Sequence, residues 1–224
     1  IGNGMVSYKL CELLSEYDQG DSFDISVFCE EPRPAYDRVK LTSFFEKESA
    51  DELLLAGADW YKERKIRLLL GERAVRVDRG RRAVLSSSGE WIRFDNVVLA
   101  TGSAPFVPPI PGVQKPGVFV YRTIEDLVAI REYAKTAKVG AVLGGGLLGL
   151  EAAKAVHDLG LTTHVVEFAP RLMPRQLDAA GGRLLQKSVE ALGVKVHTSR
   201  AATSILGDER AEGLMFKDGE TLEC

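Results

Sequence analysis

Two glycine-rich segments, 142 residues apart, carry the residues that could hold a phosphate-bearing ligand. The first reads Ile1-Gly2-Asn3-Gly4-Met5-Val6-Ser7 and the second reads Leu143-Gly144-Gly145-Gly146-Leu147-Leu148-Gly149. In such a loop the first glycine permits a tight turn, the second lets the backbone approach a pyrophosphate, and the third lets the next helix pack close to the strand. The unsatisfied N–H groups at the start of that helix, together with its dipole, then hold the phosphates.

An acidic residue follows each glycine segment in the sequence, at about the spacing expected of an acid that binds a ribose. Glu30 and Glu167 each end a β-rich stretch that comes after a helical one, and Glu167 lies 18 residues beyond Gly149, close to the roughly 20 expected. Such a carboxylate accepts hydrogen bonds from a ribose diol and repels a 2′-phosphate, which favours NAD over NADP. The pattern predicts two dinucleotide sites, although Ser7 replaces the third glycine of the first copy. The alternative is that both loops are only tight strand-to-helix turns.

The elements that position these loops alternate between helix and strand. The apolar spacing predicts helices over 5–17, 51–64, 123–135, 147–159 and 178–192, and strands over 23–29, 66–70, 96–100, 139–143, 163–166 and 194–198. The apolar run 96–100 is expected to be a buried parallel strand, and 74–78, 82–86 and 91–94 a small antiparallel sheet. This order predicts an α/β fold of two Rossmann-like domains, each with parallel strands and crossover helices.

A proline-rich stretch divides the chain. Five of the nine prolines fall within residues 103–117, which favours a stiff connector. We therefore expect one domain over 1–122 and a second over 123–224. The chain begins at Ile1 and ends on a hairpin-like stretch, which predicts a piece of a longer protein whose first domain is incomplete.

The composition narrows the function classes. The 29 basic and 32 acidic residues give a net charge of −3, and the pI near 5.8 argues against a general nucleic-acid binder. No apolar run is long enough to cross a membrane, and three scattered cysteines do not suggest a disulfide framework, so a reducing cytoplasm is the expected compartment. The three histidines show no metal-ligand spacing, so no metal site is predicted.

Together with the stretch 99–105, which reads LATGSAP, the two glycine segments resemble the FAD-dependent pyridine nucleotide oxidoreductases, a family with two dinucleotide-binding domains. The resemblance implies that the first site holds FAD and the second NADH, with hydride transfer from nicotinamide to flavin. The FAD-binding residues it implies are Gly2, Gly4, Met5, Glu30, Arg38, Ala74, Thr101 and Gly102. The NADH-binding residues it implies are Gly144, Gly146, Leu147, Leu148, Gly149, Glu151 and Glu167, with Glu151 near the nicotinamide.

Within that family, the stretches 27–33, 35–39 and 119–127 are similar to the large subunits of NADH-dependent nitrite reductases. That resemblance implies an electron-input module whose electrons continue through an iron–sulfur centre to sirohaem elsewhere in the same polypeptide, where nitrite becomes ammonia. It also allows for a small subunit and a homodimer as partners. Ser43 stands where many relatives of this family carry a lysine beside the flavin.

The remaining chemistry leaves two alternatives. The chain has neither a Cys-x-x-Cys nor a Cys-x₄-Cys pair, so the flavin is expected to pass its electrons to something other than a protein thiol. No side chain is assigned as catalytic, because the two cofactors carry the hydride chemistry. A stand-alone NADH-dependent reductase of rubredoxin or ferredoxin is one alternative, and a non-catalytic nucleotide-sensing module is the other.

Overall fold

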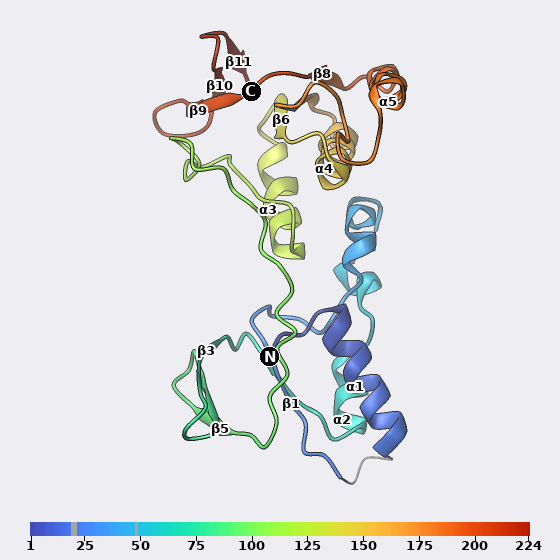
Figure 1. Ribbon diagram of the computed structural model, residues 1–224, viewed down its shortest axis with the longest axis vertical. Helices are drawn as coiled ribbons and strands as arrows, with labels where there is room; N and C mark the ends of the chain where they lie inside the picture. Colours follow the sequence, from blue (N-terminus) through green and yellow to red (C-terminus); the bar gives the residue numbers. More distant parts are fainter. Residues whose placement is uncertain (19–21, 48) are drawn as a thin grey trace. The chain divides into compact units, whose positions relative to one another are not determined.

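The computed structural model describes residues 1–18, 22–47 and 49–224. The chain forms two compact units (Figure 1). Unit 1 comprises Ile1–Leu41 and Lys47–Ala104, and unit 2 comprises Thr42–Glu46 and Pro105–Cys224. The fold class is confirmed, because each unit combines a parallel sheet, flanking helices and a three-stranded antiparallel sheet. The assignment of one nucleotide to each domain stays a prediction.

Unit 1 begins with the first glycine segment and the helix that follows it. Its elements, in chain order, are α1 (Met5–Asp18), β1 (Ser26–Cys29), the 3-10 helix η1 (Arg38–Glu46), the 3-10 helix η2 (Ala50–Leu53), α2 (Ala58–Glu63), β2 (Arg67–Leu70), β3 (Ala74–Asp78), β4 (Ala83–Ser86) and β5 (Trp91–Arg93). Strands β1 and β2 pair in parallel, whereas β3, β4 and β5 form an antiparallel sheet. The last residues of η1, from Thr42, belong to unit 2.

The core of unit 1 lies between α1, α2 and the parallel strands. Cys11, Val27, Tyr61 and Ile66 are all at most 5% exposed and pack together. Cys11 lies on α1, Val27 on β1, Tyr61 on α2 and Ile66 directly before β2, so their burial holds helix α1 against the sheet. The glycine loop at the start of α1 is thereby held at the end of β1.

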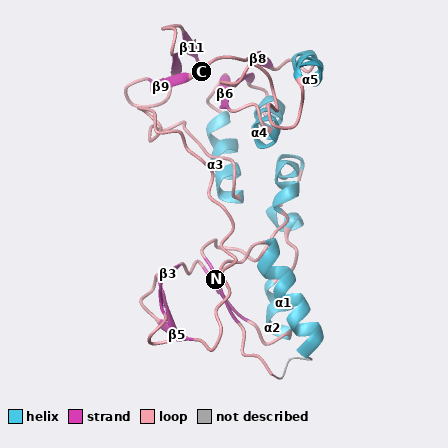
Figure 2. Cartoon of the chain, viewed as in Figure 1, coloured by secondary structure: helices cyan, strands magenta, loops and turns pink. Residues whose placement is uncertain are grey.

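Unit 2 repeats this plan with a longer sheet. Its elements are α3 (Ile124–Ala134), β6 (Val139–Leu143), α4 (Leu147–Asp158), β7 (Thr162–Val166), α5 (Ala179–Ala191), β8 (Lys195–His197), β9 (Ala202–Leu206), β10 (Gly213–Phe216) and β11 (Thr221–Glu223). Figure 2 shows the same helices and strands by type. Strands β6, β7 and β8 run in parallel, and β9, β10 and β11 pair antiparallel.

Two clusters form the core of unit 2. Ala153 on α4 packs with Val165 of the parallel sheet and with Leu172 and Val194. The second cluster joins Val166 to the antiparallel sheet, with Ile110, Val113 and Val118 of the proline-rich segment packed against it. The segment expected to be only a connector therefore contributes apolar side chains to unit 2, and the Pro111 and Pro116 carbonyls accept hydrogen bonds from the N–H groups of Ile205 and Ala211 at 2.8 Å.

Two predicted elements are wrong. Residues 96–100 do not form a buried strand, since Val98 and Leu99 are 53% and 68% exposed. The reason is that, within the described part of the chain, their backbone pairs only with Ile1: the Ile1 nitrogen donates to the Val98 carbonyl at 2.7 Å and the Ala100 N–H to the Ile1 carbonyl at 2.8 Å. Two hydrogen bonds to a single residue do not amount to the repeated pairing of two β-strands.

The expected helix over 51–64 is also wrong, because it divides into η2 and α2. Leu54 is extended and the Leu55 N–H donates to the Ala35 carbonyl at 2.8 Å, so the backbone there pairs with another segment instead of continuing a helix. A capping box at Ser49 begins η2, and Gly57 begins α2.

Candidate nucleotide-binding sites

The first glycine loop lies between two other segments of unit 1. The Gly2 N–H donates to the Phe28 carbonyl at 3.0 Å, on β1. On the other side, a Cβ at Gly2 would come within 2.3 Å of the Ala100 carbonyl oxygen and 3.0 Å of the Thr101 Cα. The φ of Gly2 is +99°, so only glycine suits this position. The structure therefore brings the predicted residues Gly2 and Thr101 together. The predicted residue Gly102 directly follows Thr101 in the sequence.

The space above the first loop is open. A Cβ at Gly4 would meet no atom within 4 Å, and the side chains of Met5 and Val6 at the start of α1 are 37% and 74% exposed. Beneath the loop, Asn3 is 9% exposed and accepts a hydrogen bond from the Tyr61 hydroxyl at 3.1 Å. Its amide nitrogen is buried without a partner among the described residues. These features fit a loop whose backbone a ligand can approach closely.

The acids after β1 are not equivalent. Glu30, the predicted ribose ligand, is exposed and lies 3.8 Å from an Arg73 guanidinium nitrogen. Glu31 instead accepts a hydrogen bond from the Tyr36 hydroxyl at 2.6 Å and pairs with Arg38. Arg38, the predicted phosphate ligand, also donates to the Tyr36 hydroxyl at 2.7 Å and stacks over its ring. Sequence reasoning missed the roles of Glu31 and Tyr36, and the only available signal was the close spacing of an acid, a tyrosine and an arginine.

The second glycine loop is closed more tightly than the first. The Gly144 N–H donates to the Val166 carbonyl at 2.8 Å, and a Cβ at Gly149 would lie 2.0 Å from the Gly144 carbonyl oxygen. The loop is held from outside by the Met173 N–H, which donates to the Gly145 carbonyl at 2.9 Å. By contrast, a Cβ at Gly146 would meet no atom within 4 Å. The loop thus has a crowded underside and an open upper side.

Glu167 supports this loop from below. It is 4% exposed, and its two carboxylate oxygens accept hydrogen bonds from the Gly145 N–H at 2.6 Å and the Ala169 N–H at 2.8 Å. Its own N–H donates to the His197 carbonyl at 2.8 Å, which fixes its backbone at the end of β7. A buried carboxylate satisfied by backbone donors gives the loop one fixed shape and places a negative charge beside it.

Helix α4 begins without a side-chain cap. The N-cap residue of α3, Thr123, and that of α5, Asp178, each accept a hydrogen bond from a backbone N–H of the first turn, whereas the N-cap residue of α4 is Gly146. The side chains of Leu147 and Leu148 above this turn are 58% and 59% exposed. The first N–H groups of α4 therefore face the open side of the glycine loop with the positive end of the helix dipole, an arrangement suited to phosphate.

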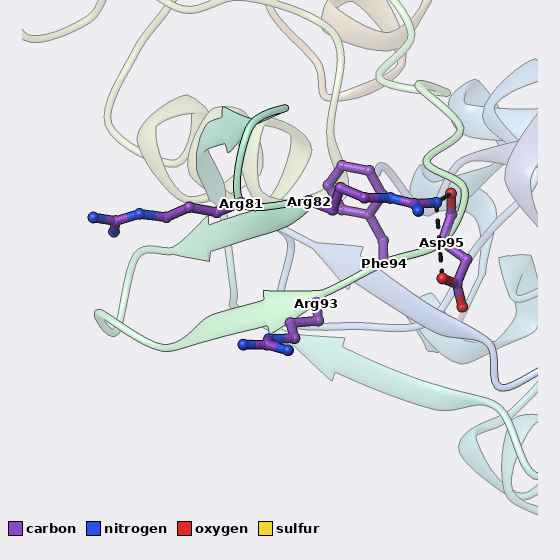
Figure 3. A pocket seen from close by; sticks show the side chains of 5 residues that line it. All are labelled: Arg81, Arg82, Arg93, Phe94 and Asp95. Carbon is purple, nitrogen blue, oxygen red and sulfur yellow. Dashed lines mark hydrogen bonds and ion pairs between the residues drawn. The ribbon is translucent and has the colours of Figure 1, made fainter.

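The remaining predicted residues are placed as follows. Ala74 begins β3 opposite Ser86, and Glu151 lies one turn into α4. A hollow of about 350 Å³ on the antiparallel sheet of unit 1 contains none of the predicted residues; its lining is Arg81, Arg82, Arg93, Phe94 and Asp95 (Figure 3). Arg82 reaches Asp95, while Arg81 and Arg93 extend elsewhere, so these cations do not converge on one ligand.

Comparison with known proteins decides the family. The chain matches the pyridine nucleotide-disulphide oxidoreductases over residues 1–224. It belongs to that family. The predicted family and the prediction of an oxidoreductase are thereby confirmed. The disulphide in the family name has no counterpart here, because Cys11, Cys29 and Cys224 are all free thiols.

Individual relatives agree. The chain is 49% identical over its whole length to the nitrite reductase (NADH) large subunit of Escherichia coli strain K12, of which it covers 27%. It is 36% identical to the assimilatory nitrate reductase electron transfer subunit of Bacillus subtilis strain 168, again over its whole length and covering 29% of that protein. The chain thus spans about a quarter of the length of the nitrite reductases of Escherichia coli, Klebsiella oxytoca and Bacillus subtilis.

A solved structure supports the fold. A ferredoxin reductase of Rhodopseudomonas palustris superposes with a TM-score of 0.91 at 27% identity, covering all of this chain and 55% of that one. Among the described residues, no helix is both long enough and apolar enough to span a membrane. The assignment of individual cofactor-binding residues stays a prediction.

Proposed function

We propose that this chain binds FAD at the first glycine loop and NADH at the second, and serves as the electron-input module of an NADH-dependent nitrite reductase that converts nitrite to ammonia. The observation that carries the proposal is the second loop, where an uncapped helix start, an open space at Gly146 and the buried acid Glu167 occur together. The whole-length similarity to the nitrite reductase large subunit of Escherichia coli supports the nitrite-reducing context.

The chain's own residues act by binding and orienting. The first N–H groups of α4 hold the pyrophosphate, and the open position at Gly146 lets it approach the backbone. The carboxylate of Glu167 disfavours a 2′-phosphate nearby, which predicts a preference for NADH over NADPH. When bound, FAD supplies the acceptor for the hydride of NADH. No side chain has to donate or remove a proton for that transfer, so orientation and exclusion of water are what the protein contributes.

The thiols of unit 1 do not suit a redox relay. Burial raises the pKa of the Cys11 thiol and of the Cys29 thiol, so both stay protonated and unreactive at neutral pH. The electrons are therefore proposed to leave the flavin for a centre elsewhere in the longer polypeptide, as the iron–sulfur and sirohaem path of the resembling enzymes implies. A small subunit and a homodimer remain proposals of the same kind.

The test of the cofactor assignment is a visible spectrum. The purified chain, reconstituted with FAD, is titrated with NADH in the absence of oxygen. The flavin absorbance is expected to bleach with about one equivalent of NADH, and more slowly with NADPH. A chain that binds NADH but never flavin would support a nucleotide-sensing module, and one that binds neither would overturn the proposal.

A second candidate is a reductase of ferredoxin or rubredoxin, which the superposition on the Rhodopseudomonas palustris ferredoxin reductase favours. The two candidates differ in the electron acceptor. The full-length protein is assayed for NADH oxidation with nitrite and with a ferredoxin in turn. Ammonia formed in proportion to NADH supports nitrite reduction, whereas oxidation that requires added ferredoxin supports the second candidate.

A further inference from the structure

A five-residue segment of the chain, Thr42–Glu46, packs in unit 2 although its neighbours in sequence belong to unit 1. The Tyr121 hydroxyl donates a hydrogen bond to the Thr42 hydroxyl oxygen at 3.1 Å. Phe44 is only 3% exposed, and the Arg131 guanidinium lies 4.7 Å from the centre of its ring. The segment is therefore anchored to unit 2 by a polar contact and by a buried aromatic ring.

Helix α4 borders the same segment. The charge of Glu46 is one of the influences that raise the pKa of Lys154 on α4, after the hydrogen bond from Lys154 to Asp158. Glu151 lies three residues before Lys154, and residues at this spacing share a face of a helix. Burial is the main cause that raises the pKa of Tyr121, and the charge of Glu151 raises it further. Thr42 and Tyr121 are hydrogen-bonded to each other, and Glu151 lies near enough for its charge to act on Tyr121; these three residues of unit 2 are called the polar cluster.

The hydrogen-bond capacity of this cluster is incompletely used. Glu151 is half-buried and makes no hydrogen bond or ion pair among the residues that the structure describes. Because its pKa is raised, the Tyr121 hydroxyl stays protonated at neutral pH and donates a hydrogen bond to the Thr42 hydroxyl oxygen. A hydroxyl that accepts from one neighbour still has its own proton to donate. The cluster therefore offers a donor at Thr42 and an acceptor at Glu151, the complement of a primary carboxamide.

The second glycine loop and Glu167 indicate which carboxamide would reach the cluster. If the pyrophosphate lies on the start of α4 and the adenosine ribose lies toward Glu167, the other half of the dinucleotide must leave in the other direction. Glu151 is four residues after the exposed Leu147, on the same face of α4, one turn from the loop. The nicotinamide end of NADH carries a primary carboxamide.

We propose that Tyr121 is a positioning residue for the nicotinamide end of NADH. Its hydroxyl fixes the Thr42 hydroxyl, so that Thr42 donates to the carboxamide oxygen while Glu151 accepts from the amide nitrogen. This inference rests on the proposed function, because it requires NADH at the second glycine loop.

The experiment compares two ligands that share an adenosine diphosphate ribose but differ in the nicotinamide. Dissociation constants for NADH and for ADP-ribose are measured by calorimetry on the chain, on Tyr121→Phe and on Thr42→Val. Each variant is expected to weaken NADH about fivefold, as for one hydrogen bond, and to leave ADP-ribose unchanged. The double variant should lose little more than either single one, because both remove the same contact.

Tyr133→Phe is the matched control. Tyr133 lies on α3 in the same unit, its ring packs on Phe119 at 5.3 Å, and its hydroxyl makes no hydrogen bond among the described residues. This variant should bind both ligands as the original chain does. Equal weakening of both ligands in Tyr121→Phe, or no weakening of either, would overturn the positioning role. An original chain that binds neither ligand would overturn the proposed function, and this inference with it.

Discussion

Glu167 and Glu30 follow corresponding strands of the two units, yet one is 4% exposed and the other is an exposed side chain near Arg73. Both carboxylate oxygens of Glu167 accept hydrogen bonds from backbone N–H groups, one of which is that of Gly145 in the second glycine loop. Nothing comparable joins Glu30 to the first loop among the described residues. There the acid that is bonded is Glu31, and its partners are Tyr36 and Arg38.

This difference teaches that one sequence pattern can be stabilised in two ways. The second loop is held by its acid, so the side chain predicted to select the ribose also shapes the loop predicted to hold the phosphates. The first loop is held by backbone neighbours, since Gly2 lies between the Phe28 and Ala100 carbonyls. Its acid Glu30 is instead exposed beside Arg73. Substitutions at matched positions should therefore have unequal effects in the two units.

The largest contrast is expected at the third position of each motif. In Gly149→Ala the new Cβ would lie 2.0 Å from the Gly144 carbonyl oxygen, a backbone atom that cannot move without opening the loop. We expect a loss of about 3 kcal/mol in the free energy of unfolding of unit 2, and no detectable NADH binding. Ser7→Ala, at the corresponding site in unit 1, should cost only about 1 kcal/mol. Urea unfolding checks both, and equal losses would contradict the contrast.

Substitution of the two acids, Glu167 and Glu30, should give the next largest difference in stability between the units. Glu167→Gln replaces one oxygen by an NH₂ group that faces a backbone N–H, which should cost about 1.5–3 kcal/mol of stability and lower the preference for NADH over NADPH. Glu30→Gln should change stability by less than about 0.5 kcal/mol, because the side chain is exposed. The ratio of dissociation constants for NADH and NADPH is the measurement. If it is unchanged in Glu167→Gln, the ribose is held elsewhere.

A smaller difference between the units is expected in how their stability depends on pH. All three histidines lie in unit 2, where the His164 and His197 ring nitrogens are 3.0 Å apart and the rings are stacked. Burial, and then nearby positive charge, lowers the pKa of both rings. The unfolded state thus binds more protons, so unit 2 should keep its full stability above about pH 6.5 and lose some as the pH falls toward the lowered pKa values.

Thermal unfolding between pH 5 and 7.5 measures this loss. His164→Gln should flatten the profile, and the control is His157→Gln, since His157 lies on α4 and shares no hydrogen bond or ring contact with the pair among the described residues. An unflattened profile in His164→Gln would contradict the assignment of the pH dependence to the pair.

Much of this arrangement could be predicted from the sequence, because the glycine spacing and the alternating apolar runs depend on local constraints. The order of α4, β7 and α5 follows from periodicity alone. What could not be predicted depends on distant partners. Residues 96–100 look like a core strand but, among the residues that the structure describes, pair only with Ile1. The helix expected over 51–64 is interrupted where the Leu55 N–H donates to the Ala35 carbonyl.

The site shows the same limit. The sequence predicted Glu167 as a ribose ligand, which stays a prediction, but not its support of Gly145, because that contact spans 22 residues and depends on the turn after β7. The phosphate contact of Arg38 stays a prediction, and the sequence did not predict the ion pair of Arg38 with Glu31. The Tyr121–Thr42 hydrogen bond joins segments that lie 79 residues apart. Local spacing finds a loop, but only tertiary packing shows what holds it.

The central claim, one nucleotide at each loop, is tested most directly by two matched variants. A Cβ at Gly4 or at Gly146 meets no atom within 4 Å, so Gly4→Ala and Gly146→Ala should both fold, and each methyl group should occupy the space a pyrophosphate needs. The measurement is binding of FAD and of NADH to each variant. We predict that Gly4→Ala loses FAD and keeps NADH, and that Gly146→Ala loses NADH and keeps FAD. Retention of both ligands by both variants, or the reverse pairing, would contradict the account.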